Sequence, residues 1–272
     1  MVEPIKRKTL WSVLRNCLRA SLALWTVFVG VVLLWAVARE TLTVEQMARV
    51  QARSAFEKDA VYRQWVASHG GVYVPVSEKT PPSPYLSDVD ERDITTPSGR
   101  ALTLVNPPYM TRQVHEMALQ LHGLRGHITS LDPIRPANAG DEWETKALKA
   151  LEQGEMEVSS VEELDNARHM RLMRPLITTE ACLKCHAEYG NKVGDLRGGI
   201  SVSVPMAPLQ TAAREHIATL ALGHGLIWLL GMGAITIGGL HLRRFARLRD
   251  WAKEQSGDHY GRDRRGTRQK PR

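Results

Sequence analysis

Two long apolar runs constrain this chain more than any other feature. They cover residues 20–38 and 217–240, and neither contains Asp, Glu, Lys or Arg. A helix needs about 20 residues to cross the hydrocarbon core of a bilayer, which is roughly 30 Å thick. Both runs are therefore predicted to be transmembrane helices that bracket a large middle segment, residues 39–215.

The charged residues predict the orientation of these helices. Residues 1–19 carry five Lys/Arg against one acidic residue, and residues 241–272 carry 11 against four. The middle segment carries 20 against 24, a formal charge of −4. Because Lys and Arg gather in the cytoplasmic flanks of membrane helices, we expect a basic cytoplasmic N-terminus, a basic cytoplasmic tail and an external middle segment. Nothing in this distribution favours a nucleic-acid partner.

A cleaved signal peptide is the alternative interpretation of the first run. Residues 36–38 read Ala-Val-Ala, which is the small-residue form of a cleavage site. However, the apolar run is longer than the roughly 7–15 residues usual in a signal peptide, and Trp35 lies beside the site. We therefore expect an uncleaved anchor.

The middle segment contains the sequence Cys-Leu-Lys-Cys-His, which includes Cys182, Cys185 and His186. This is the spacing of covalent c-type haem attachment, in which two thiols bond the porphyrin and the adjacent imidazole ligates the iron. Such attachment takes place on the outer side of the bacterial cytoplasmic membrane, where the charge pattern puts residues 39–215. The sequence predicts one covalent haem c, with His186 as the proximal iron ligand, in a periplasmic domain tethered to the inner membrane.

Two other functions of a Cys-x-x-Cys pair remain as alternatives. A closed structural zinc site needs four ligands, and the middle segment has no second cysteine pair. A redox dithiol is expected beside a thioredoxin-like βαβ unit, whereas the residues before the motif predict a strand ending at Pro175 and a short connection. Haem attachment is the favoured interpretation.

The ligand on the other side of the iron decides much of the function. A firmly held Met or His favours electron transfer, and an open position allows a diatomic gas to bind. The middle segment offers these candidates: His69, His115, His122, His127, His169, Met47, Met110, Met117, Met170 and Met173.

Most of these candidates have a simpler structural role. Met117 fits the buried apolar stripe of a helix that spans residues 108–124, and His115 and His122 lie on a neighbouring face that we expect to be exposed. His127 opens a short apolar strand after Gly126 and is our first choice as distal ligand. Met47, on the helix that leaves the membrane, is the second choice. Three arginines are candidates for holding the haem propionates, although solvated side chains are the default for Arg125, Arg171 and Arg197.

The pattern along the middle segment predicts an α+β domain. A helical stalk without Pro or Gly runs from residue 39 to 68 and ends at Gly70-Gly71. A Pro-rich loop, a helix with an Asp141-x-x-Glu144 start, and several strand-like segments follow, the last of which alternates apolar residues with serines as a half-buried strand does. We expect an antiparallel sheet with flanking helices, compatible with a PAS-like sensor.

Five segments together resemble a known family: "HGGVYVPV", "RGHITSL", "NAGDEWE", "RPLITTEACLKCH" and "GDLRGGISVSVPM". They are similar to the periplasmic single-haem c-type domain, PAS-like in fold, that forms the sensory region of many bacterial histidine kinases and diguanylate cyclases. The resemblance covers about residues 63–206. It implies haem attachment at Cys182 and Cys185, iron ligation at His186, and a role in sensing redox state or a small ligand.

The flanks indicate how a signal would leave the domain. About 32 residues follow the second apolar run, too few for a kinase or cyclase, so we expect a separately encoded partner. Small residues four apart, Ala221 with Gly225 and Ala234 with Gly238, favour close helix approach and a homodimer. The chain is thus predicted to be a membrane-anchored haem sensor without enzymatic activity. The alternative is a membrane-anchored haem c electron carrier.

Overall fold

The computed structural model describes residues 3–180 and 192–266, and the predicted haem-attachment residues Cys182, Cys185 and His186 lie outside the described residues. The chain divides into two compact units. One unit joins residues 1–40 to residues 214–272, and the other is formed by residues 41–213. Two helices, α1 (Glu3–Ser68) and α5 (Met206–Gly266), take part in both units.

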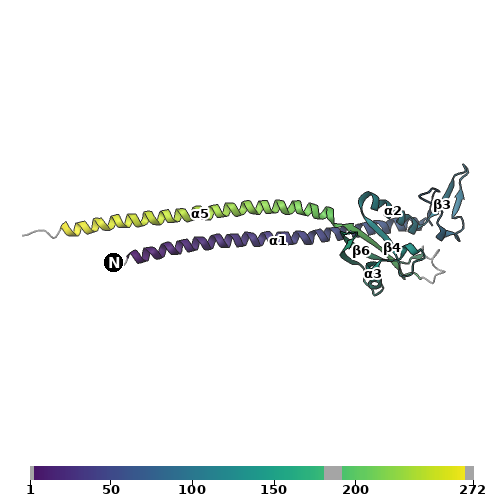
Figure 1. The fold of residues 1–272 in the computed structure, drawn as a ribbon, viewed down its shortest axis with the longest axis horizontal. Coiled ribbons are helices and arrows are strands. Elements are labelled where there is room, and N and C mark those ends of the chain that lie inside the picture. Colours follow the sequence, from purple (N-terminus) through teal and green to yellow (C-terminus); the bar gives the residue numbers. More distant parts are fainter. Residues whose placement is uncertain (1–2, 181–191, 267–272) are drawn as a thin grey trace, which may run out of the picture. The chain divides into compact units, whose positions relative to one another are not determined.

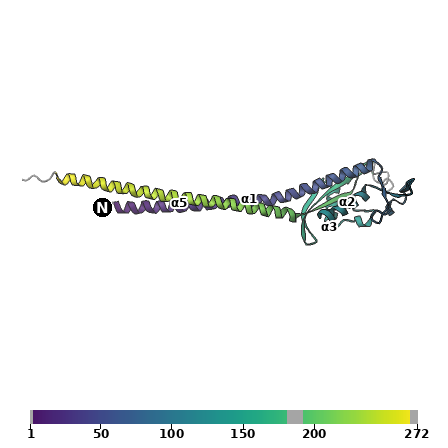
Figure 2. The same cartoon turned by 90° about the horizontal axis from the view of Figure 1, so that it is seen from above.

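The first unit consists of the apolar ends of α1 and α5, which lie side by side in Figures 1 and 2. Trp25 Nε1 donates a hydrogen bond to the Trp228 carbonyl at 3.2 Å, and Trp228 Nε1 donates to Thr26 Oγ1 at 3.0 Å. Gly231 lies directly against the Trp25 ring, where a Cβ atom would clash at 2.2 Å. Both helices are long and apolar enough to cross a membrane, as the sequence predicts.

The small residues used in this contact differ from the predicted ones. Gly231 and Gly239 face α1, whereas a Cβ atom at Gly225 or Gly238 would meet nothing within 4 Å. Gly225 and Gly238 therefore do not contact α1, and the homodimer that their spacing predicts stays a prediction.

The second unit contains two antiparallel sheets. The larger has the order β4-β7-β6-β5, formed by Arg125–Thr129, Leu196–Pro205, Ala167–Ile177 and Val158–Leu164. The smaller has the order β1-β3-β2, formed by Val72–Pro75, Ala101–Val105 and Asp93–Thr95. The α+β prediction is confirmed. Strands β2 and β3 were not predicted, because strands of three and five residues are too short for a clear alternation.

Residues 41–68 of α1 cover one face of the larger sheet, which we name the α1 face. Ala48 and Ala52 are fully buried there, in a core with Val44, Phe56, Met170, Leu172, Ile200, Val202 and Val204. The helix ends at Ser68, as predicted, and Gly70 follows with φ of 75°. The predicted stalk is therefore a core helix, because its small residues four apart let it lie close to the sheet.

Helix α3 (Glu142–Glu152) covers the opposite face, which we name the α3 face and which Figure 1 shows beside β6 and β4. The predicted start is confirmed by a capping box between Asp141 and Glu144. Leu148 packs against Met173 of β6 in a second small core. The predicted half-buried strand is wrong in one respect: Ser201 and Ser203 of β7 are buried, because α3 covers the serine side.

Helix α2 (Pro107–His122) begins at the N-cap Asn106 and ends at Gly123, which has φ of 67°. The predicted apolar stripe is wrong, since Met117 is 59% exposed. The buried side chains are instead Tyr109, Thr111 and His115. The side of α2 that carries Thr111 and His115 is buried because it meets polar partners on α1: Arg63 donates a hydrogen bond to Thr111, and Asp59 contacts His115.

Candidate functional site

A cavity of about 800 Å³ lies in the second unit. Its walls come from the Pro-rich segment 81–86, from α2, from β4, from the loop of residues 130–138 and from the start of β7. Much of the wall is apolar, and it includes Pro81, Pro84, Leu86, Tyr109, Leu119, Ile128, Ile134 and Leu176. The cavity can therefore hold a largely apolar ligand of the size of a cofactor.

The cavity lies beside the described residues that flank the Cys-x-x-Cys-His motif. Strands β6 and β7 pair as far as Ile177 and Leu196, and the Thr178 N–H donates to the Asp195 carbonyl at 2.9 Å. The motif follows Thr178 by four residues and lies outside the described residues. Leu176 and Gly198, at this end of the β6–β7 hairpin, line the cavity.

Arginine side chains supply the positive charge at the cavity wall. Arg125 forms an ion pair with Asp165, and Arg135 Nη1 donates to Asn138 Oδ1 at 3.1 Å. The side chain of Arg197 has no hydrogen bond or ion pair with any residue that the structure describes. Of the three arginines named as propionate candidates, for which solvated side chains were the default expectation, Arg125 and Arg197 line this cavity and Arg171 does not.

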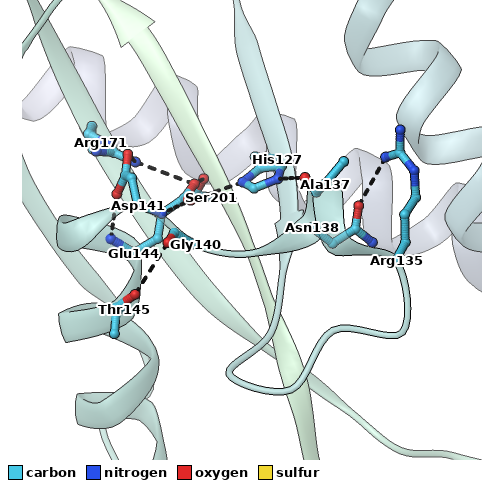
Figure 3. Close-up of polar contacts among 10 residues, drawn as sticks. All are labelled: His127, Arg135, Ala137, Asn138, Gly140, Asp141, Glu144, Thr145, Arg171 and Ser201. Carbon is cyan, nitrogen blue, oxygen red and sulfur yellow. Dashed lines mark hydrogen bonds and ion pairs between the residues drawn. The ribbon is translucent and has the colours of Figure 1, made fainter.

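Arg171 belongs to a buried polar network on the α3 face, drawn in Figure 3. Its guanidinium lies 2.8 Å from the Asp141 carboxylate and 3.3 Å from that of Glu144. Ser201 donates a hydrogen bond to Glu144, and the Arg171 guanidinium lies over the Trp143 ring. The expectation that Arg171 is solvated is wrong, since it is 4% exposed and two carboxylates compensate its charge.

His127 completes this network. Its Nδ1 donates to Glu144 Oε2 at 2.9 Å, and its Nε2 donates to the Ala137 carbonyl at 3.1 Å. The hydrogen bond to Glu144 raises the pKa of His127 above its ordinary value, although burial opposes the shift. Burial acts to raise the pKa of Glu144, but the hydrogen bonds from His127 and Ser201 outweigh it, so this pKa is lowered. Both shifts favour the ionised forms of this partly buried pair.

Of the two predicted distal ligands, His127 and Met47, the fold places only His127 at the described cavity wall. His127 lines the cavity from β4, but both of its ring nitrogens already donate hydrogen bonds. Met47 is 55% exposed on α1 and is not among the described residues that line the cavity. Iron ligation by either residue stays a prediction.

Five other candidates for the distal iron ligand are either buried in the core or exposed to solvent. Met170 and Met173 are core residues on the two opposite faces of the sheet, at 1% and 0% exposure. His169 is buried, with its Nδ1 3.0 Å from the Ala167 carbonyl oxygen. His69 and His122 are exposed. None of these five side chains is among the described residues that line the cavity.

His115 is the functional candidate that the sequence analysis placed wrongly. It was expected to be exposed, but it is 8% exposed and lines the cavity. Its Nε2 donates to Asp59 Oδ2 at 2.7 Å, and Asp59 is itself buried on α1. A sequence signal existed, because Asp59 continues the buried stripe of Ala52 and Phe56 and a buried carboxylate requires a partner.

The fold and the cavity together define an α+β domain that contains a ligand-sized cavity and is joined in sequence to two apolar helices. Residues 39–205 match the model of the Tll0287-like family, and the chain belongs to this family. Among solved structures, it matches the "Crystal structure of the cyanobacterial heme-protein Tll0287" with 16% sequence identity and a TM-score of 0.39. That match covers 59% of this chain and 95% of the other. The comparison with curated proteins found no match.

Proposed function

We propose that this chain is a membrane-anchored periplasmic sensor that carries one covalent haem c. Cys182 and Cys185 bond the porphyrin and His186 ligates the iron. The observation that carries the proposal is the cavity of about 800 Å³ beside the residues that flank this motif. Membership of the Tll0287-like family supports it, because the family is named after a protein described as a heme-protein.

The cavity fits a haem by size, wall chemistry and charge. Cofactor sites span about 300–1,000 Å³ and are mostly apolar, with a few placed polar groups. The prolines, tyrosines and leucines of the wall exclude water from a porphyrin face, and Arg197 is available for a propionate carboxylate. The bound haem supplies reversible one-electron chemistry and an axial position on its iron.

The elements around the cavity suit a sensor. Asp59 and Arg63 of α1 reach the cavity or its lining, and α1 is continuous in sequence with the first apolar run. Strand β7 lines the cavity and is followed directly by α5, which contains the second apolar run. A change of iron state that alters the packing around the haem can bias these helices if it favours one of two arrangements. We propose a PAS-like domain that acts on a separate partner, as a homodimer and without enzymatic activity of its own.

Covalent haem is tested with the full chain, expressed together with a haem c maturation system. Haem staining on a denaturing gel should be positive for the wild type and for Cys17→Ala, and it should be lost in the Cys182→Ala/Cys185→Ala variant. Staining that persists in the double variant would refute attachment at this motif, and absence of staining in the wild type would refute haem c altogether.

The sensor role is tested against the electron-carrier role by hydrogen exchange of the matured full chain. A sensor should show different amide protection of residues 41–68 of α1 in the ferric and ferrous states. Equal protection in both states, together with rapid electron exchange, would instead support a carrier. Binding of carbon monoxide to the ferrous form then separates a gas sensor from a redox sensor.

A further inference from the structure

We propose that His115 is the second axial ligand of the haem iron, with Asp59 as the carboxylate that holds its ring. The inference rests on the proposed haem function and adds the residue that completes the iron coordination. Three observations carry it: the face of the sheet on which His115 lies, the engagement of its ring nitrogens, and the composition of the cavity wall.

The strand register separates the two cavity histidines. Directly paired residues of antiparallel strands point to the same face, and Gly126 and Ile128 of β4 pair with Val202 and Ile200 of β7. They therefore lie on the α1 face, where Leu176 also packs against the core. His127 pairs with Ser201, on the α3 face. The apolar wall at the end of the hairpin and His115 thus share the α1 face, and His127 points to the other.

His115 is held in place on that face by two contacts. Its ring lies on the backbone of Gly126, where a Cβ atom would come within 2.5 Å of three ring atoms. Its Nε2 donates to Asp59 Oδ2 at 2.7 Å, and the two side chains are 9% and 7% exposed. Both β4, through Gly126, and α1, through Asp59, therefore fix the orientation of the imidazole.

The second ring nitrogen of His115 is available for a metal. Its Nδ1 has no hydrogen-bond partner among the residues that the structure describes. A neutral imidazole that donates through Nε2 keeps a lone pair on Nδ1. Histidine ligands commonly give their other ring N–H to a carboxylate, which fixes the tautomer and makes the ligand more basic. The Asp59–His115 pair has this arrangement.

The other candidates lack one of these features. The described cavity wall contains two histidines, His115 and His127, and no methionine. His127 uses both ring nitrogens as donors, to Glu144 and to Ala137, and would have to give up one contact to bind iron. A purely structural role for the Asp59–His115 pair is the competing explanation. That role would affect stability but not the coordination of the iron.

The experiment uses the matured full chain in detergent, with covalent haem first verified by gel staining. The ferric wild type should give the absorption and electron paramagnetic resonance spectra of a low-spin, six-coordinate iron. His115→Gly should lose the low-spin signal, and added imidazole should restore it. The matched control His122→Gly, at an exposed histidine of the same helix, should keep the wild-type spectra. Asp59→Asn should raise the reduction potential, because a less basic imidazole stabilises ferric iron less.

The outcomes are distinct. Stained His115→Gly with an unchanged low-spin spectrum would overturn the inference while leaving the haem function intact, and absence of stain in the wild type would overturn the haem function itself. If His115→Gly does not accumulate, His115→Met decides. A thioether ligand should change the ferric spectrum, and an unchanged spectrum would overturn the assignment.

Discussion

Removal of the Glu144 carboxylate is expected to destabilise the domain strongly. Glu144 is 3% exposed and compensates the charges of Arg171 and His127. Breaking a buried ion pair by truncating one partner costs about 3–5 kcal/mol, and losing a capping side chain costs about 1 kcal/mol. In Glu144→Ala, Arg171 still has the Asp141 carboxylate 2.8 Å away as a partner. Because this carboxylate is 49% exposed, it offsets only part of the free energy that is lost with Glu144. We therefore expect Glu144→Ala to lower the free energy of unfolding by about 3 kcal/mol.

The assay is urea unfolding of the full chain in detergent, followed by circular dichroism. Glu142→Ala is the matched control, because Glu142 lies in the same first turn of α3 and its ion pair among the described residues is with the exposed Lys146. The control should leave the unfolding midpoint unchanged. Glu144→Gln, which keeps the volume and an acceptor oxygen, should fall between the wild type and Glu144→Ala. Equal midpoints for Glu144→Ala and Glu142→Ala would refute the claim that this network stabilises the fold.

Three further predictions concern the same domain. Because the pKa of His127 is raised in the folded state, its pairing with Glu144 stabilises the fold fully below pH 6.5, and this stabilisation is lost as the pH rises through the folded-state pKa. Because the pKa of Glu144 is lowered, its contribution is fully present above pH 4.5 and is lost as the pH falls through its folded-state pKa. The stability difference between wild type and Glu144→Gln should thus be largest between these values, and a flat pH profile would contradict the pairing. Ala48→Leu should cost about 1–3 kcal/mol by overpacking the α1 face, measured by thermal unfolding, while Gln51→Leu on the exposed side should not. Gly198→Ala should reduce stability because its Cβ would lie 2.3 Å from the Thr129 carbonyl oxygen at φ of 155°, and a wild-type melting temperature would contradict this.

Local chemistry in the sequence determined where most elements begin and end. The Asp141–Glu144 capping box starts α3 because both partners are three residues apart, and Gly70 follows the end of α1 with a positive φ. The two apolar helices and the presence of a strand at β7 depend only on residue type and spacing, so they too were predicted correctly, whereas the half-burial of β7 was not. The Cys182-x-x-Cys185-His186 motif is also a local signal, since its three residues are close neighbours in the chain, and the haem attachment that it predicts stays a prediction.

The tertiary structure alone decided which polar groups are buried. Asp59 and His115 are 56 positions apart and meet only because α1 and α2 share a face of the sheet. Arg171 and Ser201 looked like surface residues, and α3 buries them with a carboxylate from its first turn. The periodic spacing of apolar and polar residues shows that a helix or strand has an apolar face and a polar face. Which of these faces is buried depends on the elements that pack against it. Burial of a polar group therefore requires a partner that only the folded chain supplies.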